Sequence, residues 1–214
     1  MSQTFKIRKG HDIKLVGSAP KTDLGSITAS TYAVTPLDFP GITPKLAVKT
    51  GTQVKAGDTL FFDKDRPEVK ICSPVSGEVA EVKRGAKRKI LAVLILADSD
   101  ITYTDHGAFS ISGATREDAE AHFSATGVGA FITSRPYGVA ASMSEKPRAI
   151  FVNGIQSGPL AGDLAYQLEG KEKSLATALK ALKLMTEGMV YVSHDADCAP
   201  IEALQSLDAT HITF

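Results

Sequence analysis

VKICSPVSGEVAEVKRGAKR, residues 69–88, determines how the N-terminal half of this chain can fold. Residues 73–77 bring Ser, Pro and Gly together, and such a cluster is typical of a sharp turn. Residues 78–83 then alternate between polar and apolar side chains, which predicts a half-buried strand. We therefore expect short strands in this stretch, joined by a turn with Pro-x-x-Gly spacing.

The same pattern of short runs and sharp turns extends over residues 45–97. Turn-forming residues interrupt the runs at Gly51, Gly57, Pro67 and Gly85. Regular turn spacing of this kind predicts an all-β sandwich or barrel. The region resembles the biotinyl/lipoyl-type barrel sandwich, a module that carries a swinging prosthetic group or serves as a docking piece in a larger assembly.

The segment before this β region has weaker patterning. Residues 5–16 alternate around Lys9 and Gly10 and predict two short strands with a turn, whereas residues 17–31 are rich in Gly, Ser, Thr and Lys and predict a loop. Three prolines within residues 36–44 favour an extended segment that cannot be a central strand.

Helical signals begin near residue 112. Thr115 is the expected N-cap of a helix with acidic residues in its first turn, and Gly127 is expected to end that helix. Farther along, apolar strands alternate with helices, which predicts a right-handed βαβ arrangement with a parallel sheet. The expected elements are buried strands at 149–153 and 189–192, helices at 171–187 and 201–207, and a last strand at 211–214.

The predicted fold class is therefore α+β with an α/β part. We expect a β barrel-sandwich domain, similar to biotinyl and lipoyl domains, over residues 1–111 and a Rossmann-like βαβ domain over residues 112–214. A parallel sheet of about three strands is thin by ordinary standards. We therefore expect the chain to be a fragment, or its sheet to be completed by more protein.

Composition narrows the functional classes. The chain carries 24 Lys and Arg against 24 Asp and Glu, so no global charge favours nucleic acid or an anionic membrane. Its longest apolar run, residues 90–97, is far shorter than the roughly 20 residues that span a bilayer, and the N-terminus shows no signal-peptide pattern. Cys72 and Cys198 form no CxxC pattern, which argues against a metal site, an iron–sulfur site and a disulfide framework. A cytoplasmic soluble protein is the default expectation.

Five motifs occur in an order that is typical of one family. They are residues 51–61, residues 73–77 (Ser-Pro-Val-Ser-Gly), residues 84–88 (Arg-Gly-Ala-Lys-Arg), residues 133–137 (Thr-Ser-Arg-Pro-Tyr) and residues 149–152 (Ala-Ile-Phe-Val). Together they resemble the A subunit of the Na⁺-translocating NADH:quinone oxidoreductase of bacterial respiratory membranes. The resemblance covers the whole chain but only the N-terminal half of the family's length, so a ubiquitin-like and a helical domain would follow in the full protein.

The resemblance implies a role within a multisubunit enzyme. In that family, electrons enter from NADH at another subunit, pass through flavins and iron–sulfur centres on other subunits and reach quinone, while Na⁺ crosses the membrane. This chain would have no catalytic residue or redox cofactor of its own, would contribute quinone binding and assembly, and would be inactive in isolation. It would lie peripherally on the cytoplasmic side of the bacterial inner membrane, with the other subunits as partners, especially one embedded in the membrane.

The related NADH-binding subunit of respiratory complex I cradles FMN in a Gly-rich loop. The matching stretch, residues 126–136, keeps two glycines, but Phe131, Arg135 and Pro136 are bulkier than a phosphate-binding loop tolerates. Residues 154–158 form only Gly-x-x-x-Gly and do not meet the dinucleotide fingerprint. We therefore expect nucleotide-binding ancestry without a flavin, as the resemblance also implies.

Phe131, Arg135, Pro136 and Tyr137 are the candidate quinone-binding residues. A quinone needs an apolar or aromatic slot for its ring and hydrogen-bond donors for its carbonyl oxygens. Phe131 and Pro136 supply walls, Arg135 and Tyr137 supply donors, and residues 40–42 are a further candidate for the same slot. The alternative is a packed loop without a ligand.

Arg84, Lys87 and Arg88 are the candidate docking residues, within a basic run that also contains Lys83 and Lys89. Such a run favours an acidic partner or lipid headgroups. The alternative is a charged and solvated hairpin tip.

Other functions stay open. An electron-transport subunit of the related Rnf type would carry iron–sulfur ligands in a later half of the protein, a carrier module would be modified on Lys64, and a third alternative is a small-molecule-binding Rossmann domain. Residues 194–198 are the one local cluster with metal-binding residue types, but their spacing fits no standard site, so no metal is expected.

Overall fold

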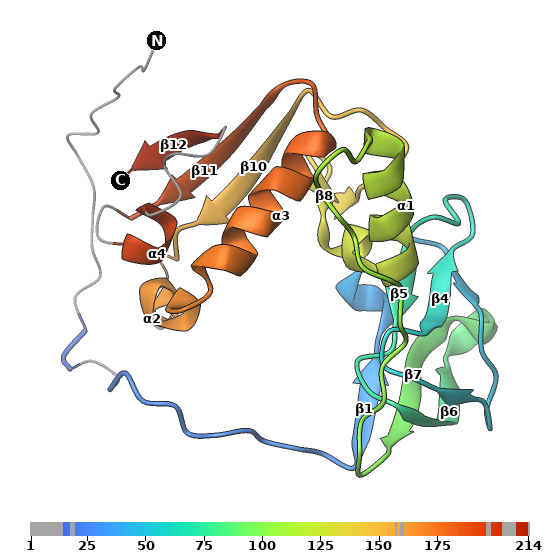
Figure 1. The fold of residues 1–214 in the computed structure, drawn as a ribbon. Coiled ribbons are helices and arrows are strands. Elements are labelled where there is room, and N and C mark those ends of the chain that lie inside the picture. The colour runs from blue at the N-terminus through green and yellow to red at the C-terminus, as the bar shows by residue number, and fades with distance from the viewer. Residues whose placement is uncertain are drawn as a thin grey trace.

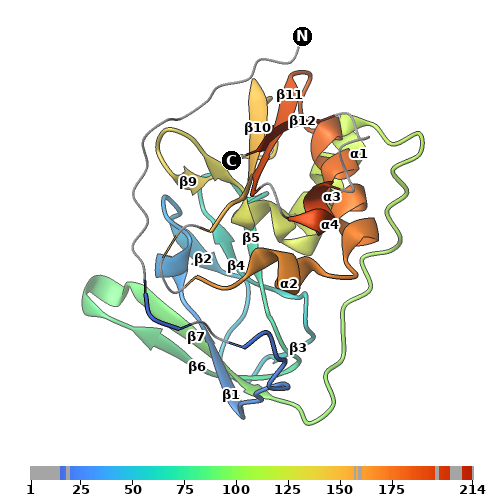
Figure 2. The same ribbon diagram turned by 90° about the vertical axis from the view of Figure 1, so that its left-hand side faces the viewer.

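Figure 1 and Figure 2 show the computed structural model of the chain, which describes residues 15–17, 20–156, 158, 161–195, 198–202 and 209–213. A β-rich part comes first and an α/β part follows, as the sequence predicts. The boundary expected between residues 111 and 112 falls in the connection between the last long strand of the β-rich part and the first α-helix, and it stays a prediction. The strands expected for residues 5–16 fall almost entirely outside the described residues.

Two antiparallel sheets share one core in the β-rich part. One sheet has the order β1-β7-β6-β3, with β1 at Thr31–Val34, β7 at Ile90–Ala97, β6 at Gly77–Arg84 and β3 at Gln53–Val54. The other has the order β2-β4-β5, with β2 at Pro44–Leu46, β4 at Thr59–Asp63 and β5 at Lys70–Cys72. The shared core includes Leu60, Phe61, Val79, Val93 and Ile95. The expected sandwich of short strands is confirmed.

The turn before β6 requires glycine. Gly77 has a φ of +151°, and a Cβ atom there would collide with the carbonyl oxygen of Leu96 on β7. Two buried serines satisfy polar groups beside it: the Ser73 hydroxyl donates to a carbonyl oxygen two residues later at 2.6 Å, and the Ser76 hydroxyl oxygen accepts from the Thr102 N–H at 3.0 Å. The Pro-x-x-Gly spacing therefore marks a point where two backbones touch.

Residues 36–44 are not extended throughout, which corrects the prediction from the prolines. A 3-10 turn, η1, spans Pro36–Asp38. Pro36 suits the start of such a turn because its fixed φ fits the helical backbone and no N–H partner is needed there. The Thr35 hydroxyl donates to the Asp38 carboxylate at 2.5 Å and holds the turn. The prolines exclude a central strand but tolerate a helical turn.

The α/β part opens with helix α1, Arg116–Thr126, which has the predicted ends. The Thr115 side chain accepts from the Asp118 N–H, the Asp118 carboxylate accepts from the Thr115 N–H, and Gly127 ends the helix with a φ of 74°. Elements too short for the sequence pattern to reveal come next: the 3-10 turn η3 at Val128–Phe131 and a hairpin of β8, Thr133–Ser134, and β9, Val139–Ala140.

A parallel sheet of order β10-β11-β12 follows, with β10 at Ala149–Gly154, β11 at Met189–His194 and β12 at Thr210–Thr213. Its helices are α2, Leu164–Leu168, α3, Glu172–Leu184, and α4, Ala199–Glu202. Helix α3 ends earlier than residue 187 because the Met185 N–H closes a tight turn onto the Leu182 carbonyl. The helix predicted for residues 201–207 coincides with α4 only at its start, and residues 203–208 lie outside the described ranges.

The strands of this sheet are buried on one face only, which corrects the prediction that both 149–153 and 189–192 are buried strands. Val190 and Val192 pack with Leu179 of α3, whereas Phe151 is 72% exposed. The strand order follows the chain, and α2, α3 and α4 all lie on one side of the sheet in Figure 1. Right-handed connections that always step in the same direction put every crossing helix on the same face. The other face is left without a layer among the described elements.

Arg66 joins the two parts of the chain. Its Nε pairs with the buried Asp63 carboxylate at 2.7 Å, and its two terminal nitrogens donate to the carbonyl oxygens of Ala140 at 2.5 Å and Gly41 at 2.9 Å. Ala130 and Ala140 belong to the core of the β-rich part. The β8–β9 hairpin is thus packed into the barrel and tied to it by one guanidinium group.

Burial alone would raise the pKa of Asp63, but hydrogen bonds from the Thr43 N–H, the Arg66 side chain and the Asp65 N–H outweigh it, so the pKa lies below its usual value. A carboxyl with a lowered pKa in the folded chain contributes stability above its unfolded pKa of about 3.9, and that stability is lost as the pH falls through the folded value.

We expect Arg66→Met to lower the free energy of unfolding by about 3 kcal/mol at neutral pH, because the buried Asp63 carboxylate loses its cation. Urea unfolding at a series of pH values should show this difference shrinking as the pH falls below about 3.9 and through the lowered pKa of Asp63, because the carboxylate of the folded chain then becomes protonated. Lys64→Met, at an exposed neighbouring position, is the control and should change stability by less than about 0.5 kcal/mol. A difference that does not depend on pH would contradict the assignment.

We expect Gly77→Ala to destabilise the chain by about 3 kcal/mol or more, since the new methyl group meets a backbone carbonyl that cannot move aside. Gly51→Ala is the matched control, because Gly51 also has a positive φ but no atom near its Cβ position. It should show only the left-handed backbone penalty of about 1 kcal/mol. Equal losses in thermal unfolding would show that the close backbone approach is irrelevant.

Candidate functional site

A groove of about 1130 Å³ lies between the β8 side of the hairpin and the uncovered side of the β10 region. It is lined by residues 131–135, 141–143 and 145–153 together with Leu182, Met185 and Tyr191. The walls come from η3 and β8, from the segment that leads into β10, from β10 and β11, and from the end of α3. Phe151 and Tyr191 can line the groove because no described helix covers their face of the sheet.

The four predicted quinone-binding residues are placed differently with respect to this groove. Phe131 and Arg135 line it. Pro136 and Tyr137 do not; they lie in the exposed turn between β8 and β9, where Tyr137 is 82% exposed. Two of the four residues predicted from the sequence therefore line the same groove.

Aromatic rings form the walls of the groove. The rings of Phe151 and Tyr191 stack with centroids 5.0 Å apart and planes 14° apart, because β10 and β11 pair them in register on the uncovered face. Phe131 is 77% exposed and meets Phe39 edge to face at 5.6 Å. Phe39 in turn packs against Phe61 of the barrel core. A planar apolar ligand would meet a flat aromatic surface here.

Phe151 and Tyr191 are not predicted by the sequence pattern, because each lies in an apolar run that is typical of a buried strand. A signal exists in the two-residue period of a strand, which puts Phe151 on the face opposite Ile150 and Val152. Only the pairing of β10 with β11 brings the two rings together from positions far apart in the chain.

The polar lining of the groove includes three cations, the carboxylate of Glu145, several hydroxyl groups and one side-chain amide. Arg135, Lys146 and Arg148 are lining residues, and Lys146 pairs with Glu187 at 3.3 Å in solvent. Asn153 lies at the end of β10, where its side-chain oxygen accepts from the hydroxyl of Ser193 at 3.2 Å. These side chains offer N–H donors to oxygen atoms on a bound ring.

Arg116 holds the segment that precedes β10. Its guanidinium donates to the carbonyl oxygens of Met185 at 2.5 Å, Glu145 at 2.8 Å and Met143 at 3.1 Å, and it pairs with Glu120. One charged group thus joins α1, the groove wall and the end of α3. These hydrogen bonds hold the backbone of the groove wall in place, and that backbone carries lining side chains.

The glycines of the loop after α1 serve packing. A Cβ atom on Gly127 would meet the sulfur of Cys72 and the carbonyl oxygen of Lys70, and one on Gly129 would meet Met143. Both glycines are buried. Their N–H groups are therefore not presented at an open surface that a phosphate could approach.

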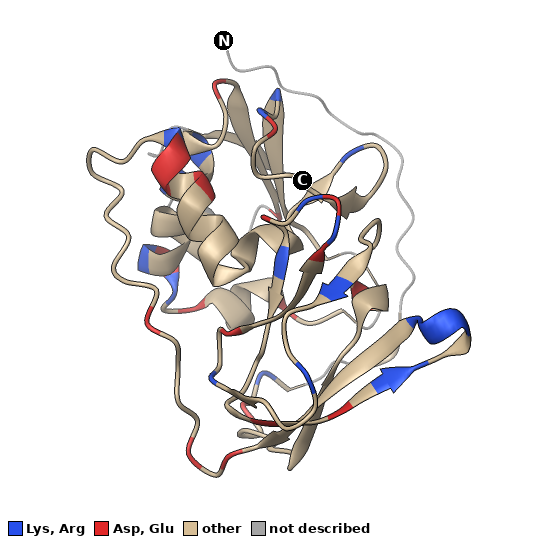
Figure 3. Ribbon diagram, turned by 90° about the vertical axis from the view of Figure 1, so that its right-hand side faces the viewer, with Lys and Arg blue, Asp and Glu red and all other residues tan. Residues whose placement is uncertain are grey.

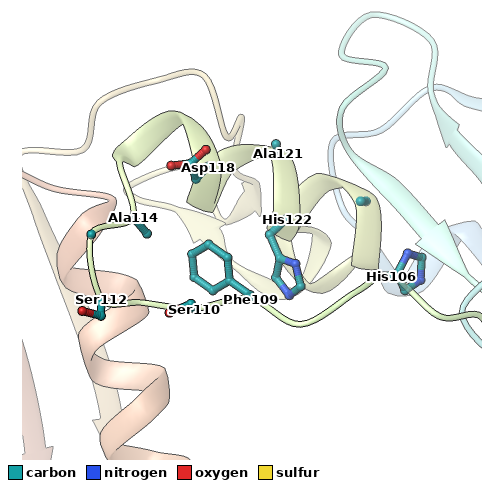
Figure 4. A pocket seen from close by; sticks show the side chains of 10 residues that line it. His106, Phe109, Ser110, Ser112, Ala114, Asp118, Ala121 and His122 are labelled. Carbon is teal, nitrogen blue, oxygen red and sulfur yellow. The ribbon is translucent and has the colours of Figure 1, made fainter.

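A smaller hollow of about 520 Å³ lies between the connecting segment and α1. Figure 4 shows Phe109 and His122 side by side, and their rings stack at 4.8 Å with planes 18° apart. Asp118, which also lines it, already caps α1; hydrogen bonds from the backbone and hydroxyl of Thr115 lower the pKa of its carboxyl. The stacked rings of Phe109 and His122 hold the segment that precedes α1 against this helix.

The predicted docking residues Arg84, Lys87 and Arg88 lie at the tip of the β6–β7 hairpin, where all three are exposed. Figure 3 shows the basic colour gathered at this tip, which projects from the body of the molecule. Lys83 and Lys89 flank the three. Within the described residues, no acidic side chain forms an ion pair with any of these five cations.

Metal-binding clusters and membrane-spanning helices are absent from the described part of the chain. No group of three or more His, Cys, Asp or Glu side chains there could hold a metal ion, and part of the 194–198 cluster lies outside the described ranges. No helix in those ranges is both long and apolar enough to cross a bilayer. Lys64 is exposed in the connection between β4 and β5, and its N–H donates to the Thr43 carbonyl.

Two family models match the chain in succession: the NqrA N-terminal barrel-sandwich hybrid domain over residues 5–98 and the NqrA second alpha/beta domain over residues 114–213. The A subunits of several Na(+)-translocating NADH-quinone reductases are similar to it over most of its length. Those of Cellvibrio japonicus and Teredinibacter turnerae are 30% and 31% identical over 212 residues, which are 98% of this chain and 47% of each relative. That of Vibrio alginolyticus is 29% identical over 196 residues, 91% of this chain and 44% of the relative.

The chain thus spans about half the length of the curated relatives it matches. Both of its parts carry the corresponding domain of one family, in the order that the resemblance from the motifs implied. The chain therefore belongs to the NqrA family, whose curated relatives are the A subunits of Na⁺-translocating NADH-quinone reductases.

Proposed function

We propose that this chain contributes quinone binding and assembly to a respiratory Na⁺-translocating NADH-quinone reductase, without a redox cofactor of its own. The observation that carries the proposal is the groove beside β10, which combines the stacked pair Phe151 and Tyr191 with Phe131 and Arg135. The similar proteins are named as subunits of this enzyme, and the groove offers a binding place for its quinone substrate.

The lining of the groove fits the chemistry of a quinone. The head group is a flat ring with two carbonyl oxygens, so it needs an aromatic surface and N–H or O–H donors at its edge. Phe151 and Tyr191 provide the surface, and Arg135, another lining residue, provides a donor. The isoprenoid tail would leave along the exposed apolar side chains of the sheet, such as Ile212 and Met189, which are 38% and 39% exposed.

The absence of a flavin from this chain is part of the proposal. A phosphate site needs N–H groups that an anion can approach, and here the two glycines of the loop after α1 are packed against the barrel and against Met143. Flavins, iron–sulfur centres and NADH would therefore be bound by other subunits. This chain would receive no electron on a group of its own and would hold the quinone that is reduced.

We place the chain peripherally on the cytoplasmic side of the bacterial inner membrane, with the other subunits as partners, especially one embedded in the membrane. The basic hairpin tip, with Arg84, Lys87 and Arg88, is its proposed docking surface. The tip and the groove are built by different elements, β6–β7 and β8–β10, so substitutions can separate docking from quinone binding.

A titration of isotope-labelled chain with a short-chain quinone, followed by backbone amide NMR, tests the groove. We expect saturable shifts confined to residues 129–138, 149–153 and 191. Phe151→Ala should weaken binding about tenfold, because an aromatic contact contributes roughly 0.5–1.5 kcal/mol beyond its burial.

Tyr103→Ala is the matched control for this titration, since Tyr103 is a 74% exposed aromatic residue outside the groove. It should leave the quinone affinity unchanged. Absent shifts, or equal losses in both variants, would refute a quinone site in these two domains.

A further inference from the structure

The tip of the β6–β7 hairpin concentrates positive charge. Five basic residues occur within seven positions, Lys83, Arg84, Lys87, Arg88 and Lys89. We call this set the basic tip. Within the described residues its one side-chain hydrogen bond runs from the Arg84 guanidinium to the Arg88 carbonyl oxygen at 3.1 Å. Among the described side chains, none holds the other four cations in a fixed position.

The backbone of the basic tip is strained where its charge is densest. Lys87 has a φ of 54° and Arg88 a φ of 60°, and they are the only residues other than glycine with a positive φ in the described ranges. The left-handed conformation costs such residues about 1 kcal/mol each, and Gly or Asn would relieve it. Strain that a simple substitution would remove is typical of functional positions.

Charge is distributed unevenly between the basic tip and the rest of the molecule. The whole chain is formally neutral, so the residues outside the tip carry a net charge of five negative against the five positive charges of the tip. Glu78 and Glu81, the acidic residues of β6, lie on the side of the tip toward the body. An anionic plane would attract the tip and repel the remainder, and it would therefore orient the molecule.

The basic tip also carries an apolar side chain. Leu91 is 40% exposed and packs over Gly85, where a Cβ atom would lie 3.2 Å from its methyl carbon. The tip projects from the body and combines cations that are not fixed by ion pairs with an exposed leucine. A lipid surface suits such a tip, because mobile headgroups need no fixed pairing geometry. An Arg cluster that recognises an acidic peptide needs cations held in a fixed pairing geometry, and apart from Arg84 the described cations of the tip have no such support.

We propose that the basic tip docks the chain on an anionic lipid surface, with Leu91 at headgroup depth. The proposal deepens the docking surface named above and rests on the membrane placement proposed there. Each Lys or Arg near an anionic leaflet contributes about a fivefold gain in partitioning, so several charges acting together suffice for reversible binding.

Co-sedimentation of the chain with vesicles tests this inference. The vesicles are phosphatidylcholine alone, or phosphatidylcholine with phosphatidylglycerol, in the absence of quinone. We expect binding only to the phosphatidylglycerol vesicles, and a strong loss of it at high salt because the charges are screened. The variant with Arg84→Gln, Lys87→Gln and Arg88→Gln should lose about a hundredfold in partition coefficient.

The matched control carries Lys171→Gln, Lys173→Gln and Lys180→Gln, which remove the same charge from exposed positions at and along α3. It should retain binding within about twofold. Leu91→Gln should weaken vesicle binding severalfold and leave binding to soluble poly-glutamate unchanged. Thermal unfolding of each variant separates a loss of binding from a loss of fold.

Three results would overturn the proposal: no binding to phosphatidylglycerol vesicles, equal losses in both triple variants, or preferential saturable binding to poly-glutamate that depends on the basic tip. The last would assign the tip to an acidic protein segment instead. The quinone titration needs no vesicles, and the vesicle assay needs no quinone. A failure of lipid docking can therefore be distinguished from a failure of quinone binding in the groove.

Discussion

The ion pair between Asp63 and Arg66 is the contact on which the arrangement of this chain depends. A carboxylate is tolerated in the barrel because two backbone N–H groups and a guanidinium satisfy it, and the same guanidinium reaches across to the carbonyls of Gly41 and Ala140. The β8–β9 hairpin is thereby fastened to the barrel, with Ala130 and Ala140 in its core. Since that hairpin supplies one wall of the groove, an interaction of the β-rich part shapes a site in the α/β part.

Strong local patterns were enough to predict much of the fold. The alternation after Gly77 predicted β6, and Thr115 with Gly127 predicted both ends of α1, because a strand period and a capping box act over a few residues. The family resemblance was likewise carried by local motifs, and the two family models confirm it. The 3-10 turn at Pro36–Asp38 was missed, since proline suits a helical start as well as an extended chain.

The candidate site was predicted only in part. Its residues come from distant positions in the chain, and the sequence does not show which face of the sheet is covered. Phe131 and Arg135 were singled out and line the groove, but Phe151 and Tyr191 meet only through the register of β10 and β11. An apolar run of four or five residues does not reveal whether a second layer covers the strand. The left-handed backbone of Lys87 and Arg88 runs against the preferences of both residues, so no propensity rule would predict it.

The uncovered face of the parallel sheet has a thermodynamic consequence. Parallel sheets are ordinarily layered on both sides, whereas the described elements cover this one on a single face. Any molecule that occupies the groove also covers Phe151 and Tyr191 and becomes part of the missing layer. Ligand binding in the groove and unfolding of the chain are then linked equilibria. A ligand at a hundred times its dissociation constant would add about 2.7 kcal/mol to the free energy of unfolding. A ligand in the groove would thus act as a structural component of the fold, and the ligand-free chain would unfold more readily.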